Sequence, residues 1–136
     1  MKYLLDTHAV SALMRGDATM IARLGEIEKS DVFVPHPVLA EIEYGLARMP
    51  KSRKRASLRA TFELVRDELQ RAPWSDEVDV HFGAAKAELE RRGTRLEDFD
   101  LAIAAHALAL DAVLVTDDIA HMARITGLVV ESWIAR

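Results

Sequence analysis

The chain has 136 residues, half of them hydrophobic, and we expect one domain with a single core over residues 1–136. It has no cysteine, which excludes a disulfide framework and a thiolate metal site, and its net charge of −4 argues against coating of nucleic acid by bulk charge. No segment resembles a signal peptide or a membrane span of roughly 20 apolar residues, so we expect a soluble, cytoplasmic protein.

Short apolar runs and helical spacings alternate through the first half of the chain. A buried strand is expected over residues 3–5, and a second strand over residues 31–34, before Pro35 and Pro37. Helical spacing predicts helices over residues 8–14, 19–28 and 38–47.

The second half begins with two charged amphipathic helices. They are expected over residues 51–71 and 76–92, the second capped by Ser75 and ended by Gly93. A buried helix, apolar nearly all round, follows at residues 98–110. The remaining expected elements are a buried strand at 112–116, a short helix at 118–125 and a last strand at 128–133.

This alternation of strands and helices indicates the fold class. The strands are apolar throughout, which is typical of a parallel sheet with helices on both faces. We therefore expect an α/β fold, a three-layer α/β/α sandwich with a central parallel sheet.

Acidic side chains follow two of the predicted strands. Asp6 comes directly after the first strand, and Thr116, Asp117 and Asp118 come at the end of the strand that begins at residue 112. Parallel sheets place their sites at the carboxyl ends of strands, so these groups are expected to lie at one edge.

Two further acids lie on the inward faces of predicted helices. Glu41 shares a face with Val38 and Ile42, and Asp100 heads a stripe that continues with Ile103. An ionised carboxylate on a buried face costs on the order of several kcal/mol unless a partner compensates it. Both acids therefore need a partner.

Each acid taken alone also has a structural explanation. Asp6, Asp100 and Asp118 can cap or complement helix N-termini, and Glu41 can pair with an arginine. Four acids at one edge are harder to explain this way, because clustered carboxylates repel and so bind protons or a cation. Oxygen ligands favour Mg²⁺ or Mn²⁺, which activates water for hydrolysis of a phosphodiester or phosphoester.

The chain also resembles PIN-domain proteins, in particular the VapC-type ribonuclease toxins of bacterial toxin–antitoxin pairs. The resemblance covers essentially the whole length and rests on four stretches in matching order: LLDTHAVSAL, VLAEIEYGLAR, LEDFDLAIAAHALALDAVLVTDD and RITGLVVESW. It implies an endoribonuclease that uses Mg²⁺ or Mn²⁺, a homodimer and a small antitoxin partner. The implied catalytic and metal-binding residues are Asp6, Glu41, Asp100 and Asp118, with Thr7, Thr116 and Asp117 lining the site.

The sequence departs from the family pattern near three of these acids. His8 stands where asparagine is often found, Glu97 replaces a common glycine, and Asp117 replaces asparagine or arginine. We take Asp118 as the fourth acid from the family's T-x-D pattern, with Asp117 as the substitute. Asp98 is expected to be the N-cap of its helix rather than a ligand.

Positive charge is concentrated near the start of the helix expected at residues 51–71. Arg53, Lys54 and Arg55 are candidate RNA contacts, and a solvated helix face explains them equally well. The same two explanations apply to a second basic group, at residues 91–95.

The large aromatic residues and one histidine complete the sequence-based expectations. Trp74, Phe99 and Trp133 are expected in the core or an interface, and His106 in the core. The alternative to a nuclease is a non-catalytic PIN-like module that holds a protein or RNA partner. A phosphatase would need a DxD pattern after the first strand, or paired acids there with a lysine after a later strand. Asp6 is followed by Thr7 and His8, and no lysine follows AVLVT.

Overall fold

The computed structural model describes residues 1–134. Its strands are β1 (Lys2–Leu5), β2 (Val32–Pro35), β3 (Gln70–Ala72), β4 (Ala112–Val115) and β5 (Val130–Glu131). Its helices are α1 (Thr7–Met14), α2 (Ala18–Gly25), α3 (His36–Ala47), α4 (Arg53–Glu68), α5 (Asp76–Arg91), α6 (Asp98–Leu110) and α7 (Ile119–Met122), with a 3₁₀ turn at Lys29–Asp31. No helix in this part of the chain is long and apolar enough to cross a membrane.

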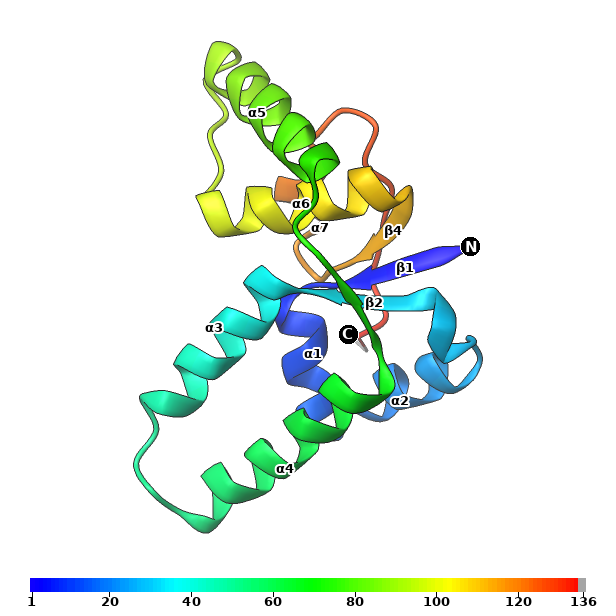
Figure 1. Cartoon of the computed structure of the whole chain (residues 1–136), viewed down its shortest axis with the longest axis vertical. Coiled ribbons are helices and arrows are strands. Elements are labelled where there is room, and N and C mark those ends of the chain that lie inside the picture. Colours follow the sequence, from blue (N-terminus) through cyan, green and yellow to red (C-terminus); the bar gives the residue numbers. More distant parts are fainter. Residues whose placement is uncertain (135–136) are drawn as a thin grey trace.

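The strands form a parallel sheet in the order β3-β2-β1-β4-β5. In Figure 1, α5 and α6 lie above the sheet and α1, α2 and α4 lie below it. This arrangement confirms the predicted three-layer α/β/α sandwich.

The core lies on both faces of β1 and β4. Leu4 and Leu5 of β1 and Leu114 of β4 are fully buried, as expected for strands covered by helices on both sides. Helix α6 packs against β1 and β4, and its Ile103 is 1% exposed. These contacts hold the carboxyl ends of β1 and β4 in place, and with them the residues that follow each strand.

The strand order places a topological switch point at the centre of the sheet. From β1 the chain adds β2 and β3 on one side, then crosses to β4 and β5 on the other. Leu5 pairs with Val115, so Asp6 and Thr116 follow neighbouring strands at the same level. Ligands of open α/β sheets bind at the carboxyl ends of strands at such a point.

The ends of the helices follow local signals in the sequence. Ser52 and Ser75 cap α4 and α5 by accepting hydrogen bonds from the amides of Arg55 and Val78. The backbone beyond α5 turns at Gly93, whose φ of 69° suits a residue without a side chain. The predicted N-cap at Ser75 and stop at Gly93 are thus confirmed.

Several predicted boundaries are wrong. The helix expected over residues 51–71 ends at Glu68, and Gln70–Ala72 forms the edge strand β3. The helix expected over residues 19–28 ends at Gly25, and the last strand shrinks to Val130–Glu131. Pairing of β3 with β2 and of β5 with β4, which local periodicity does not report, sets the limits of the two strands.

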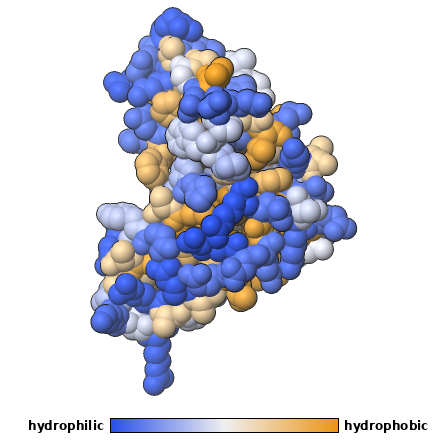
Figure 2. Space-filling model, in the orientation of Figure 1, coloured by the Kyte–Doolittle hydropathy of each residue, from blue (hydrophilic) through white to orange (hydrophobic). Residues whose placement is uncertain are grey.

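One single-residue expectation also needs correction. The N-cap of α6 is Glu97, while Asp98 is the first helical residue and pairs with Lys86 at 3.0 Å. Of the three aromatic residues expected in the core or an interface, Trp133 is buried, whereas Trp74 and Phe99 are 47% and 50% exposed and stay predicted interface residues. On the face drawn in Figure 2, hydrophobic residues (orange) form separate patches among hydrophilic ones (blue).

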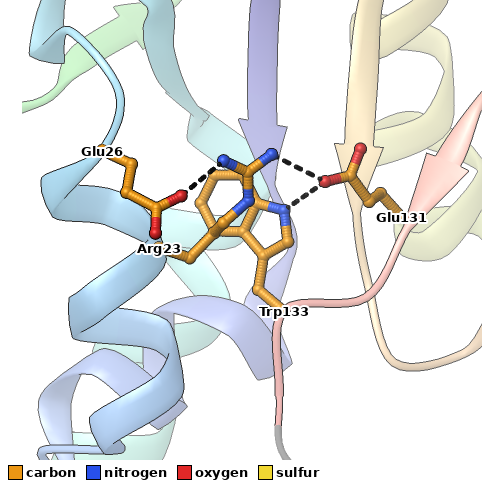
Figure 3. A network of polar contacts seen from close by, with 4 residues as sticks. All are labelled: Arg23, Glu26, Glu131 and Trp133. Atoms are coloured by element: carbon orange, nitrogen blue, oxygen red, sulfur yellow. Dashed lines mark hydrogen bonds and ion pairs between the residues drawn. The ribbon is translucent and has the colours of Figure 1, made fainter.

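The C-terminal segment is held against α2 by the polar contacts drawn in Figure 3. Arg23 bridges Glu26 at 3.1 Å and Glu131 at 3.2 Å, and the Trp133 indole N–H donates to the same Glu131 oxygen at 2.9 Å. The guanidinium also lies 5.4 Å from the centre of the Trp133 ring. This cluster fixes β5, which in turn supports the end of β4.

Candidate active site at the carboxyl edge of the sheet

Asp6 is the most buried acid of the site, with only 5% of its surface exposed. It is the N-cap of α1, and its Oδ1 accepts a hydrogen bond from the amide of Ala9 at 2.8 Å. Its own amide donates to the carbonyl of Val115 at 3.1 Å, which continues the pairing of β1 with β4. Burial raises the pKa of the Asp6 carboxyl, while hydrogen bonds from Thr116 and Ala9 oppose that rise.

Thr116 connects the ends of the two central strands. Its side chain is hydrogen-bonded to Asp6, and its Oγ1 accepts from the amide of Asp118 at 3.0 Å. Its amide donates to the carbonyl of Glu131 at 3.0 Å. Thr116 is 1% exposed, so its hydroxyl orients the acids from inside the protein and does not face solvent.

Glu41 enters the site from α3. The hydroxyl of Thr7, the first residue of α1, donates to Glu41 Oε1. This hydrogen bond joins the helix that follows β1 to the helix that follows β2. The partner that Glu41 needs is therefore Thr7 rather than an arginine.

Asp100 lies in the first turn of α6, and its pKa responds to the other acids of the site. Burial raises the pKa of its carboxyl, and the charges of Glu41, Asp118 and Asp6 raise it further. The exposed His8 lowers the pKa of both Asp100 and Asp6 by its charge. The charges of the other three predicted acids therefore all act on Asp100, although the four acids come from different parts of the fold.

Asp118 and Asp117 point to different neighbours. Asp118 caps α7, and its Oδ1 lies 2.7 Å from Nδ1 of His121. Asp117 Oδ1 accepts from the hydroxyl of Ser132 at 3.3 Å, and its charge acts on Asp6. The charge of Asp118 raises the pKa of Asp100, whereas the charge of Asp117 raises the pKa of Asp6, so the two acids lie beside different members of the set.

The arrangement was tested for its fit to a divalent cation. Within residues 1–134, no three acidic or histidine side chains stand close enough to enclose a metal ion. Mg²⁺ usually keeps several waters and takes one or two carboxylates from the protein, so a closed cage is not required. The donor set of carboxylate oxygens, with two pKa values raised by mutual repulsion and burial, fits a hard cation in its chemistry.

Two hollows lead away from the acids. A cavity of about 540 Å³ is lined by Asp100 and Asp118 together with Arg95, His121 and Arg124. A groove of about 370 Å³ begins at Thr7 and Glu41 and runs between α1, α3 and α4. Its apolar lining residues are Met14, Ile42, Leu46, Met49 and Leu58.

The candidate RNA-contacting residues of α4 lie beside the groove or outside it. Arg53 and Lys54 are exposed at the start of α4, and Lys54 lines the groove. Arg55 donates to the carbonyl of Met49 at 3.3 Å and so closes the turn between α3 and α4. The sequence did not single out Arg124 or His121, and only the position of His121 three residues after Asp118 gives a local signal of their role.

Comparisons with known proteins agree with this geometry. The PIN domain family matches residues 3–128. Ribonuclease VapC2 of Rickettsia felis is 31% identical over 135 residues, which cover 98% of each chain. The tRNA(fMet)-specific endonuclease VapC of Salmonella typhimurium is 26% identical, again with 98% of each chain covered.

A solved structure extends the comparison to three dimensions. The crystal structure of VapBC2 from Rickettsia felis, bound to a DNA fragment from its promoter, contains a chain with a TM-score of 0.88 to this protein at 28% identity. The match covers 98% of this chain and 99% of that one. With the family match and the VapC2 relative, the likeness extends over nearly the whole described chain. The protein therefore belongs to the PIN domain family and, within it, to the VapC group.

Proposed function

We propose that this protein is a metal-dependent endoribonuclease and the toxin of a toxin–antitoxin pair. The observation that carries the proposal is that four acids lie near the switch point of the sheet, where the charges of Asp6, Glu41 and Asp118 act on Asp100. Membership of the VapC group, whose relatives include ribonucleases and a tRNA-specific endonuclease, supports RNA as the substrate class.

The four carboxylates have different tasks in this proposal. Asp6 is held rigidly by Ala9 and Thr116 and presents a fixed oxygen to a cation. Asp100 and Asp118 supply oxygens on the side of the large cavity, and Glu41 supplies one on the side of the groove. We infer that Asp117 is the outer neighbour of this set rather than its fourth member.

The proposed reaction is hydrolysis of a phosphodiester. A Mg²⁺ or Mn²⁺ ion bound there would lower the pKa of water and offset negative charge on the phosphate. A water oxygen forms a bond to phosphorus, the bond from phosphorus to one ribose oxygen breaks, and that oxygen takes up a proton. The carboxylates orient the attacking water and accept its proton, so no histidine base is needed.

We infer that a small antitoxin covers the groove between α1, α3 and α4. Its apolar floor suits the apolar face of a peptide segment, and its end at Glu41 suits an arginine that replaces the charge of the metal. Solved relatives from Rickettsia felis and Salmonella typhimurium are VapBC complexes, which supports such a partner. An antitoxin that leaves metal affinity unchanged on binding would count against occlusion by arginine.

The homodimer implied by the resemblance and the cytoplasmic location expected from the sequence stay predictions. Light scattering on the purified protein tests the first. An RNA substrate is the reason to expect the second.

The test is RNA cleavage by the purified protein, freed of any partner, with Mg²⁺ or Mn²⁺ and with EDTA. Asp6→Asn is the inactivating variant. Asp111→Asn is its matched control, because Asp111 is an exposed C-cap with a φ of 53° that asparagine tolerates. Cleavage that needs both metal and Asp6 supports the nuclease. Full cleavage by Asp6→Asn contradicts it, and metal binding without cleavage favours a binding module.

A further inference from the structure

The large cavity beside the acids has a cationic wall. Asp100 and Asp118 line one part of it, and Arg95 and Arg124 line another. We propose that Arg95 and Arg124 bind the phosphate backbone of RNA on one side of the bond that is cut. This inference rests on the proposed nuclease function and adds to it the residues that hold the strand.

Arg124 is positioned for such a contact. It is half-buried, and within residues 1–134 its side chain makes no ion pair. The turn that carries it is fixed, because Arg92 donates to the backbone carbonyl of Arg124 and the Thr126 hydroxyl donates to Glu88 at 2.8 Å. The backbone at Arg124 is therefore fixed, and its side chain lines the cavity without an acidic partner.

Arg95 is available in a different way. Its side chain is 77% exposed, and its pairing with Glu90 spans 4.0 Å. An exposed pair of that length contributes little to holding the side chain, so a phosphate replaces it at small cost. Two further acids, Glu97 and Asp98, line the cavity. Asp98 already pairs with Lys86 at 3.0 Å, and within residues 1–134 the exposed Glu97 makes no ion pair with either arginine.

The chemistry of the wall favours phosphate over other ligands. Arginine presents a planar fork that binds two oxygens of one phosphate. The groove that begins at Thr7 and Glu41 carries Arg15 and Lys54 as its cations, but its floor is apolar and suits a protein segment better than a charged backbone. A strand held by Arg95 and Arg124 would pass directly in front of Asp100 and Asp118.

Phosphate contacts have a measurable signature in the salt dependence of binding. Each phosphate neutralised on a single strand changes the slope of log K against log salt by about 0.7. Loss of both arginines is therefore expected to reduce that slope by about 1.4 and to weaken binding roughly tenfold near 0.15 M salt.

The experiment measures binding of a fluorescein-labelled, unstructured RNA of mixed sequence by fluorescence anisotropy, with Mg²⁺ and at several salt concentrations. The protein carries Asp6→Asn so that the RNA stays intact. Arg95→Ala with Arg124→Ala is compared with Lys2→Ala plus Arg71→Ala, which removes two exposed positive charges that do not line the cavity. Arg124→Lys keeps the charge if Arg124→Ala does not fold.

The outcomes separate this inference from the function on which it rests. A tenfold loss with the reduced slope in the cavity variant, and less than a twofold loss in the control, supports the phosphate contacts. Equal effects of the two double variants, while the protein with Asp6 intact still cleaves RNA, overturn the contacts and leave the nuclease standing. No cleavage and no RNA binding by the protein with Asp6 intact overturn both.

Discussion

Replacing Thr116 by valine removes one hydroxyl from the centre of the site and keeps the shape of the side chain. That hydroxyl is hydrogen-bonded to the Asp6 carboxylate and accepts from the amide of Asp118 at 3.0 Å. Both groups would lose a partner at a position where Thr116 is 1% exposed and water does not replace it. The protein is therefore expected to lose stability.

The size of the loss follows from the two hydrogen bonds. A hydrogen bond to a charged group contributes about 1.5–3 kcal/mol, and a neutral one about 0.5–1.5 kcal/mol, so Thr116→Val is expected to lower the free energy of unfolding by roughly 2–4 kcal/mol. With an unfolding entropy of about 2.1 cal/mol/K for each of 136 residues, the melting temperature falls by roughly 7–14 °C.

The loss should also depend on pH. Burial holds the pKa of Asp6 above its ordinary value, and the Thr116 hydrogen bond acts against that rise. Without the hydroxyl the folded-state pKa rises further, so ionising Asp6 costs more stability. The difference between variant and parent is therefore largest at neutral pH and shrinks as the pH falls through the folded-state pKa of Asp6.

Urea unfolding of the metal-free protein at neutral and acidic pH measures this effect. Thr116→Ser is the control, because it keeps the hydroxyl and loses only a buried methyl group, at a cost of about 1 kcal/mol. If Thr116→Val is no less stable than Thr116→Ser at neutral pH, the account of Thr116 as the link between Asp6 and Asp118 is wrong.

Two further predictions concern Asp118 and His106. Asp118→Asn is expected to lower kcat more than about 100-fold, and Asp117→Asn no more than about 10-fold. The reason is that the charge of Asp118 acts on Asp100, while Asp117 accepts a hydrogen bond from Ser132. Equal losses in the cleavage assay would contradict the choice of Asp118 as the fourth acid. Burial lowers the pKa of His106, with a smaller lowering by the charge of His36. The unfolded chain therefore binds a proton at His106 more readily than the folded protein does. The free energy of unfolding is at its full value above the ordinary pKa of 6.5 and decreases as the pH falls below it. Urea unfolding from pH 7.5 to 5.5 should show this slope in the parent and a weaker one in His106→Leu; identical slopes would contradict it.

The sequence carries much of the fold in its apolar runs. Residues 3–5 and 112–115 are apolar throughout and became the central strands, because strands buried on both faces need such side chains. The edge strand β3 was missed because Gln70 and Arg71 are exposed and follow a charged helix without a break in the pattern. Its assignment depends on pairing with β2, which lies far away in the sequence.

The candidate site likewise contains residues that the sequence predicts and contacts that it does not. Asp6 and Asp118 were found from their places after strands, and Glu41 and Asp100 from inward helix faces. The hydrogen bond between Thr7 and Glu41 joins residues that are 34 positions apart, and no local pattern predicts it. Arg124 became a cavity residue through the turn after α7, whose path depends on contacts with α5.

The central claim is that a divalent cation binds among Asp6, Glu41, Asp100 and Asp118, with some of these carboxylates contacting it through its water ligands. Mn²⁺ binding, measured by electron paramagnetic resonance on the parent, on Asp6→Asn, on Asp100→Asn and on the exposed control Asp111→Asn, tests it most directly. We predict that the parent and Asp111→Asn bind Mn²⁺ alike and that Asp6→Asn and Asp100→Asn bind it at least about 10-fold more weakly. Equal Mn²⁺ affinity in all four proteins would contradict the account.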